Sequence, residues 1–153
     1  MILVSTNPPH AKNICDGVKT IEWRKKPLPV GKALIYETKK NGGCGMVIGE
    51  AEVVRSIVVD PEGLIRGWMI IMGCVDLGLL RKYAEGKTLY ANFLINPKLY
   101  DEPIPVYKFH KGGSCRKCLF RTYRPECTDY YNCNGEGGPL TRPPQSWCYV
   151  EKQ

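Results

Sequence analysis

The stretch Gly17–Lys26, which reads GVKTIEWRKK, decides how this chain can fold. A half-buried strand alternates apolar and polar side chains, so that one face meets the core and the other meets water. Taken as a strand, this stretch carries charge on both faces. The two faces are Val18, Thr20, Glu22 and Arg24 on one side, and Lys19, Ile21 and Trp23 on the other. Whichever face turns inward brings charged groups with it, and buried charge requires an ion-pair partner or a wet recess.

The segments around this stretch predict many short strands and few helices. The expected helices span residues 8–16 and 76–84, and the expected strands span 1–5, 18–24, 32–38, 46–59, 88–95, 104–107 and 146–150. Prolines and glycines predict loops or turns at 25–31, 39–45 and 96–105, while 63–73 is left unassigned. The order shows no βαβ alternation. It therefore predicts an α+β fold, a small and mostly antiparallel barrel with short helices at its mouth, in one domain over 1–153.

The composition is that of a small basic protein. With 153 residues and 43% hydrophobic side chains, the chain suits one packed domain. It has no apolar run of about 18 residues and no basic leader at its N-terminus, so we expect no membrane partner and a cytoplasmic location. The net charge of +7 favours a polyanionic partner, and nucleic acid is the first to consider.

Several segments together resemble the ASCH domain family, a branch of the PUA-like barrels. The segments are the G-x-K-x-x-E-x-R pattern of Gly17–Arg24, IYET at 35–38, GEAEV at 49–53, Tyr90-Ala91, LYDEPI at 99–104 and PPQSWCYV at 143–150. The resemblance covers 1–107 and 143–151, and the cysteine-rich part at about 110–140 looks like an insertion. It implies a PUA-like, mixed and mostly antiparallel β-barrel, with a cleft beside the first helix that binds RNA or modified nucleosides.

In such a barrel Lys19, Glu22 and Arg24 lie at the cleft and become ligand-binding candidates. Lysine can neutralise a phosphate, the arginine fork suits a phosphate or a base edge, and a glutamate can accept from an exocyclic amine. The other candidates are Tyr36, Thr38, Gln145 and Ser146. A structural ion-pair network without a ligand remains the alternative. Trp23 points away from Glu22 in a regular strand, so we expect it in the core.

A hydrolase of the same fold is a second reading, because some ASCH relatives are acetylcytidine amidohydrolases. The resemblance implies a threonine nucleophile assisted by a lysine and a glutamate. This chain keeps Lys19, but Glu22 occupies the threonine position. The catalytic candidates are therefore Lys19 and Glu22 only, and whether the protein is an enzyme stays open. A metal-independent ribonuclease using Lys19 and Tyr36 is the other hydrolase to consider.

Four cysteines of the insertion follow the spacing C-x2-C-x8-C-x5-C. They are Cys115, Cys118, Cys127 and Cys133. Two thiolates two residues apart can reach one metal ion, and two more complete a tetrahedral site. We predict a structural zinc ion here, with an iron–sulfur cluster or disulfides as alternatives.

The insertion and its first flank are also basic and aromatic. The basic residues are Lys108, Lys111, Arg116, Lys117, Arg121 and Arg124. Basic and aromatic residues in alternation are typical of single-stranded nucleic-acid surfaces, although a solvated basic knuckle has the same composition. We therefore expect an RNA- or modified-nucleotide-binding module. A hydrolase and a zinc-knuckle protein-interaction domain are the alternatives, and the ligand and the oligomeric state stay open.

Overall fold

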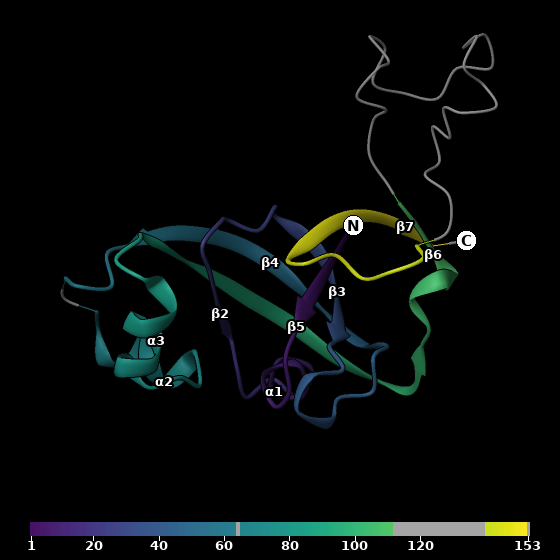
Figure 1. Cartoon of the computed structure of the whole chain (residues 1–153), viewed down its shortest axis with the longest axis horizontal. Helices are drawn as coiled ribbons and strands as arrows, with labels where there is room; N and C mark the ends of the chain where they lie inside the picture. The colour runs from purple at the N-terminus through teal and green to yellow at the C-terminus, as the bar shows by residue number, and fades with distance from the viewer. Residues whose placement is uncertain (64, 112–139, 153) are drawn as a thin grey trace, which may run out of the picture.

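A twisted seven-stranded sheet forms the frame of the protein (Figure 1). The structure is a computed structural model, and it describes residues 1–63, 65–111 and 140–152. The strands are β1 (Ile2–Thr6), β2 (Ile21–Arg24), β3 (Gly31–Glu37), β4 (Val47–Val59), β5 (Leu89–Ile104), β6 (Phe109–Lys111) and β7 (Trp147–Lys152). The helices are α1 (His10–Cys15), α2 (Gly67–Met72) and α3 (Leu77–Ala84), with single 3-10 turns η1 (Lys40–Gly42) and η2 (Val106–Lys108).

The strands lie in the order β2-β5-β4-β3-β1-β7-β6. In the described part of the chain β1 and β3 run parallel, and the other neighbouring pairs are antiparallel. The predicted α+β, mostly antiparallel architecture is confirmed. The edge strands β2 and β6 do not pair with each other within the described residues, so the sheet curls without closing.

The prediction of a loop over 96–105 is wrong, because β5 continues through this segment. Leu99 pairs with Gly49 of β4, well beyond the expected end of the strand. The ladder changes register just before this pair, and Asn96 has a φ of 50° there. Such a bulge accommodates Pro97, which cannot donate a ladder hydrogen bond.

The strand predicted over 18–24 is shorter than expected, because β2 covers only its second half. The Lys19 N–H donates to the Asn13 carbonyl at 2.9 Å, and the Thr20 N–H donates to the Met72 carbonyl at 2.9 Å. The backbone ahead of β2 therefore bridges α1 and α2 instead of pairing with a strand. This bridge fixes the position of Lys19.

The helices cover the two ends of the sheet core. Ile14 of α1 packs under β1, β3 and β4. Figure 1 shows α2 and α3 at the end of the long β4–β5 ribbon opposite β6 and β7. There Met69 and Leu80 pack against Trp23, which is buried in this cluster as expected. The unassigned segment 63–73 supplies α2.

The predictions for the insertion lie outside the described residues. They concern the cysteines and basic residues Cys115, Arg116, Lys117, Cys118, Arg121, Arg124, Cys127 and Cys133, and the side chain of Lys111 is also not described. Among the described residues no group of three or more His, Cys, Asp or Glu side chains is placed to hold a metal ion. In the same part of the chain, no helix has the length and hydrophobicity needed to cross a membrane.

Candidate functional site

Three charged side chains meet in the interior beside β2. Lys19, Glu22 and Arg24 are only 3%, 6% and 9% exposed. The Arg24 guanidinium lies 2.9 Å from one Glu22 carboxylate oxygen, and the Lys19 ammonium lies 3.4 Å from the other. One carboxylate thus joins two buried cations. We call these three residues the buried triad.

Neighbouring polar groups hold both cations in place. Lys19 Nζ donates to the Gly73 carbonyl at the end of α2. Arg24 donates to the Ser5 carbonyl at 2.6 Å and to the Thr6 hydroxyl at 3.0 Å, both at the end of β1. Among the described residues none accepts a hydrogen bond from Arg24 Nε, although this nitrogen is buried. The triad therefore ties β2 to α2 and to β1, and it leaves one buried donor without an acceptor among the described residues.

The buried triad lines a cleft of about 990 Å³. This volume lies at the top of the roughly 300–1,000 Å³ range of small-molecule sites. The cleft is walled by the ends of β1 and β3, by α1, β2 and α3, and by the segment that leads into β7. Its polar lining residues include Ser5, Thr6, Asn7, His10, Lys19, Glu22, Arg24, Tyr36, Thr38, Lys39, Lys40, Thr141, Arg142 and Gln145.

Positive charge dominates this cleft. Its cations are Lys19, Arg24, Lys39, Lys40 and Arg142, and Glu22 is the one carboxylate among the described lining residues. Lys39, Lys40 and Arg142 are exposed, and we call them the rim. The cleft therefore attracts anions, and the rim meets them first.

The charges of Glu22 and His10 at neutral pH follow from their surroundings in the cleft. Burial by itself would raise the pKa of Glu22, but Arg24 and Lys19 outweigh burial and lower the pKa below its ordinary value. Burial and the nearby Lys19 lower the pKa of His10. At neutral pH Glu22 is therefore ionised and His10 is uncharged.

Six of the seven predicted ligand-binding residues line the cleft, and Ser146 does not. The six are Lys19, Glu22, Arg24, Tyr36, Thr38 and Gln145. The Thr38 hydroxyl donates to Asn7 Oδ1 at 2.6 Å at the end of β3. Ser146 instead accepts at its carbonyl from the Ser5 N–H, at 2.9 Å, where β1 meets β7. The fold thus brings together residues from three distant parts of the sequence.

The end of β1 and residues 141–144, which precede the predicted Gln145, also line the cleft and were not among the candidates. The Ser5 hydroxyl donates to the Pro144 carbonyl at 2.7 Å, which joins these two segments. The sequence signal that could have identified this part of the site is the pair Ser5-Thr6, because two hydroxyl residues end an otherwise apolar strand. His10 and Arg142 gave no signal, because only the folded chain brings them to the cleft.

The cleft gives limited support to threonine-based hydrolysis. Glu22 stands where the resemblance implies a threonine. Its carboxylate forms ion pairs with both cations of the buried triad. The hydroxyls of Thr6 and Thr38 line the cleft, but they bond to Arg24 and to Asn7. This arrangement can bind and orient an anion more readily than it can generate a nucleophile.

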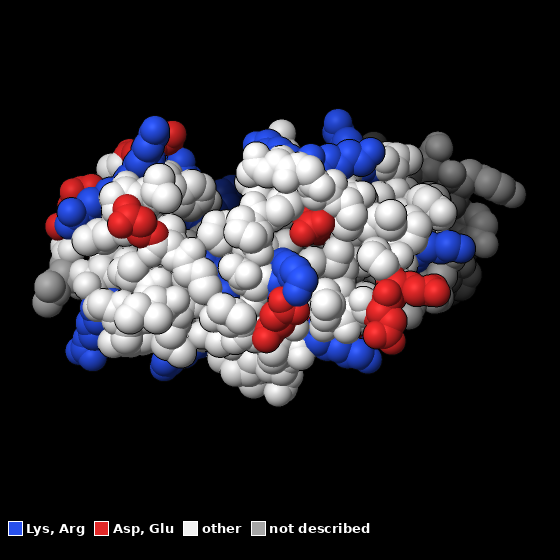
Figure 2. Space-filling model, turned by 90° about the horizontal axis from the view of Figure 1, so that it is seen from below, with Lys and Arg blue, Asp and Glu red and all other residues white. Residues whose placement is uncertain are grey.

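The predicted basic surface is represented in the described residues by Lys108. Its side chain is exposed, and its ammonium lies 5.9 Å from the centre of the Tyr107 ring. Neither residue is among those that line the cleft. On the face shown in Figure 2, basic and acidic side chains are interspersed.

The fold matches solved structures of ASCH proteins. The crystal structure of ASCH from Zymomonas mobilis superposes with a TM-score of 0.66 at 24% sequence identity, over 99% of this chain and 87% of that chain. A tyrosine-to-phenylalanine and a serine-to-alanine mutant of that protein give TM-scores of 0.63 and 0.64 at 24% and 22% identity. No protein-family model and no curated protein matches the sequence. At this identity the similarity concerns architecture, and the chain has the ASCH fold.

Proposed function

We propose that this protein binds RNA or a modified nucleotide in the cleft beside β2. The observation that carries the proposal is the excess of cations in the cleft, five against the single carboxylate of Glu22. Lysine offers a point charge and arginine a planar fork, and both are suited to phosphate oxygens. The ASCH fold supports the same function, because the family resemblance implies a nucleotide or RNA ligand.

The rim and the buried triad play different parts in this proposal. Lys39, Lys40 and Arg142 take part in no ion pair among the described residues. They can therefore neutralise phosphates without first giving up a partner. The buried triad is already held by its own contacts, so it offers preorganised donors and acceptors to a nucleobase. Phosphate contacts then position the ligand, and base contacts specify it.

The rim provides the test, because its residues can be changed without disturbing the buried triad. We expect the triple variant Lys39→Ala, Lys40→Ala and Arg142→Ala to bind a short single-stranded RNA at least about tenfold more weakly. The slope of log affinity against log salt should shrink by about 2, since each neutralised phosphate of a single strand contributes about 0.7. Fluorescence anisotropy across a salt series measures both quantities.

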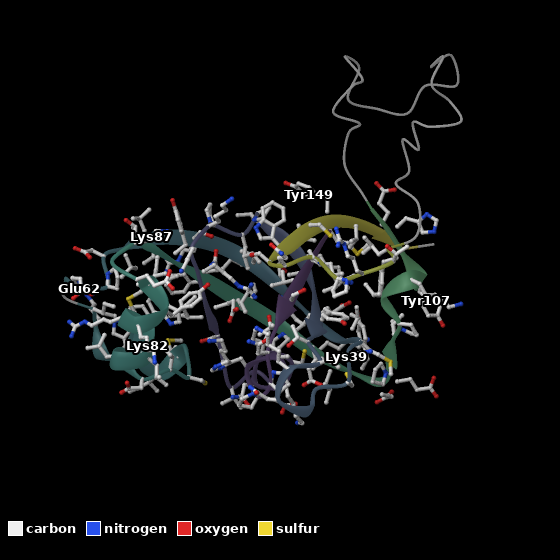
Figure 3. All side chains as sticks on the ribbon, in the orientation of Figure 1. Lys39, Glu62, Lys82, Lys87, Tyr107 and Tyr149 are labelled. Carbon is white, nitrogen blue, oxygen red and sulfur yellow. The ribbon has the colours of Figure 1, made fainter. Side chains whose placement is uncertain are left out.

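A matched control removes three cations that do not line the cleft. The residues are Lys82, Lys87 and Lys98, which are all exposed. Figure 3 shows Lys82 and Lys87 at the end of the molecule that carries α3, away from Lys39. Equal weakening by the two triple variants would mean that the overall charge, and not the cleft, attracts the RNA. That result would contradict the proposal.

The hydrolase alternative is tested with the same protein. A panel of acetylated and other modified nucleosides, and the short RNA itself, is incubated with the chain and resolved by chromatography. A binding module leaves each of them unchanged. Product formation that is lost in Lys19→Ala would replace the binding proposal with a hydrolytic one.

A further inference from the structure

One side of the cleft has a different chemistry from the cationic side. Val75, Leu79, Leu80 and Tyr83 line it there, and we call these four residues the α3 wall. Val75 precedes α3, and the other three belong to that helix. Trp23 of β2 lines the cleft together with them. The cleft therefore joins a cationic half to an apolar and aromatic half.

The exposed part of the α3 wall is not needed by the core. Leu80 is only 1% exposed and anchors the helix against Trp23 and Met69. Leu79 and Tyr83, one helical turn apart, are 63% and 44% exposed and still line the cleft. Exposed apolar groups that line a concave site are typical of a binding surface.

The ring of Tyr83 is held in place from outside the cleft. The Lys25 ammonium lies 5.3 Å from the centre of the ring, and the same ammonium pairs with Glu85 at 2.7 Å. A ring that is already positioned loses little conformational freedom when a planar ligand stacks on it.

We propose that the cleft takes two consecutive nucleotides of a single strand, the second base stacking on the α3 wall at Tyr83 and Leu79. This rests on the proposed function, since it assigns a ligand to the same cleft. The first nucleotide lies on the cationic half, at the rim and the buried triad. The cleft volume of about 990 Å³ is at the upper end of the range for small-molecule sites. A cleft of this size has room for a ligand larger than one nucleotide.

The test compares three probes whose differences isolate the second base. They are adenosine monophosphate, the 5′-phosphorylated dinucleotide pApA, and the same dinucleotide without its second base. Stacking of one base on an aromatic side chain strengthens binding roughly 5- to 150-fold. We therefore expect titration calorimetry to show pApA binding at least about fivefold more tightly than its abasic form. The two dinucleotides carry the same charge, so phosphate attraction cannot produce that difference.

Variants then locate the stacking surface. Tyr83→Ala should remove the preference for pApA over its abasic form. Leu79→Ser should reduce the preference in the same direction. Tyr107→Ala is the matched control, because Tyr107 is 59% exposed, lies under the Lys108 ammonium and does not line the cleft. Figure 3 shows Tyr107 at the end of the molecule opposite α3.

The outcomes separate the two proposals. Equal affinity for pApA and its abasic form, with adenosine monophosphate also bound, would overturn the α3-wall subsite and leave the proposed function standing. A preference that survives in Tyr83→Ala, or that is lost equally in Tyr107→Ala, would overturn it too. Failure of wild-type protein to bind any of the three probes or a short RNA would overturn the proposed function, and the subsite with it.

Discussion

Replacing Glu22 by glutamine tests the buried triad most directly. The substitution keeps the shape of the side chain and removes its charge. Lys19 and Arg24, whose side chains are only 3% and 10% exposed, then lose the carboxylate between them. Each retains its backbone acceptor, at Gly73 and Ser5 respectively. Two buried cations are left facing each other without the anion that joined them.

The expected cost follows from the distances. At an effective dielectric constant of about 20, unit charges 2.9 Å and 3.4 Å apart attract by about 6 and 5 kcal/mol. Dehydration of the ions offsets most of this attraction in the intact protein. Removing one partner of a buried pair nevertheless costs about 3–5 kcal/mol, because the remaining charge stays buried. Glu22→Gln should therefore lower the free energy of unfolding by about that amount, a large share of the roughly 5–15 kcal/mol of a typical domain.

Urea unfolding followed by circular dichroism measures this loss, with Glu50→Gln as the matched control. Glu50 pairs with Lys32 at 2.8 Å and accepts from the Tyr100 hydroxyl, which can also donate to a glutamine, and the Glu50 and Lys32 side chains are 22% and 50% exposed. A partly exposed pair whose lysine is well solvated contributes about 1 kcal/mol or less. If Glu22→Gln were no more destabilising than Glu50→Gln, the charges of the buried triad would not be coupled as described.

Two further predictions concern packing and pH. Gly73→Ala should lower the free energy of unfolding by about 1–3 kcal/mol and shift tryptophan fluorescence, because the added Cβ would lie 2.2 Å from Trp23 Nε1. Gly67→Ala, where no atom lies within 4 Å, is the control, and equal losses would refute the packing argument. The pKa values of His10 and Glu22 are lowered in the folded protein, so the unfolded chain binds more protons. The free energy of unfolding should therefore decrease as the pH is lowered. The decrease begins below the ordinary histidine pKa of 6.5 and continues below the ordinary glutamate pKa of 4.5. Urea midpoints measured from pH 7 to 4 check this prediction. In His10→Gln the midpoint should change little over the part of the range nearest pH 7. A midpoint that rises on acidification would contradict the prediction.

The alternation of charge around Trp23 was enough to predict the unusual environment of β2. Charged residues on a strand that also carries Trp23 and Ile21 had to be buried with partners or placed at a recess. The structure shows both, because the buried triad is an internal ion-pair network that also lines the cleft. The sequence of this one segment was sufficient for the prediction, because the alternation of charged and apolar residues lies entirely within it.

Other parts of the fold and site depend on contacts that no single segment encodes. A proline such as Pro97 predicts a strand break, because it cannot donate a ladder hydrogen bond, and the bulge opposite β4 allows β5 to pass through it. Arg142 reaches the cleft because β7 pairs with β1, a contact between the two ends of the chain. The spacing of Leu77, Leu80 and Tyr83 predicts that they share one core-facing stripe of α3. In the structure Leu80 and Ala84 face the core, and Tyr83 is 44% exposed. Helical periodicity gives the spacing of a face but leaves its orientation to tertiary packing.

The antiparallel pairing of β6 with β7 has a consequence for how the sequence of this protein can change in evolution. Phe109 and Lys152 are register partners, and the Leu140 N–H donates to the Phe109 carbonyl at 2.9 Å. The points where the chain leaves and rejoins the sheet, around residues 111 and 140, are thus fastened to the same short ladder. Segments whose two ends are held together can be lengthened, shortened or exchanged at small cost to the scaffold. The sheet and its cleft can therefore be inherited as one unit while the cysteine-bearing piece between these points is gained, lost or replaced independently.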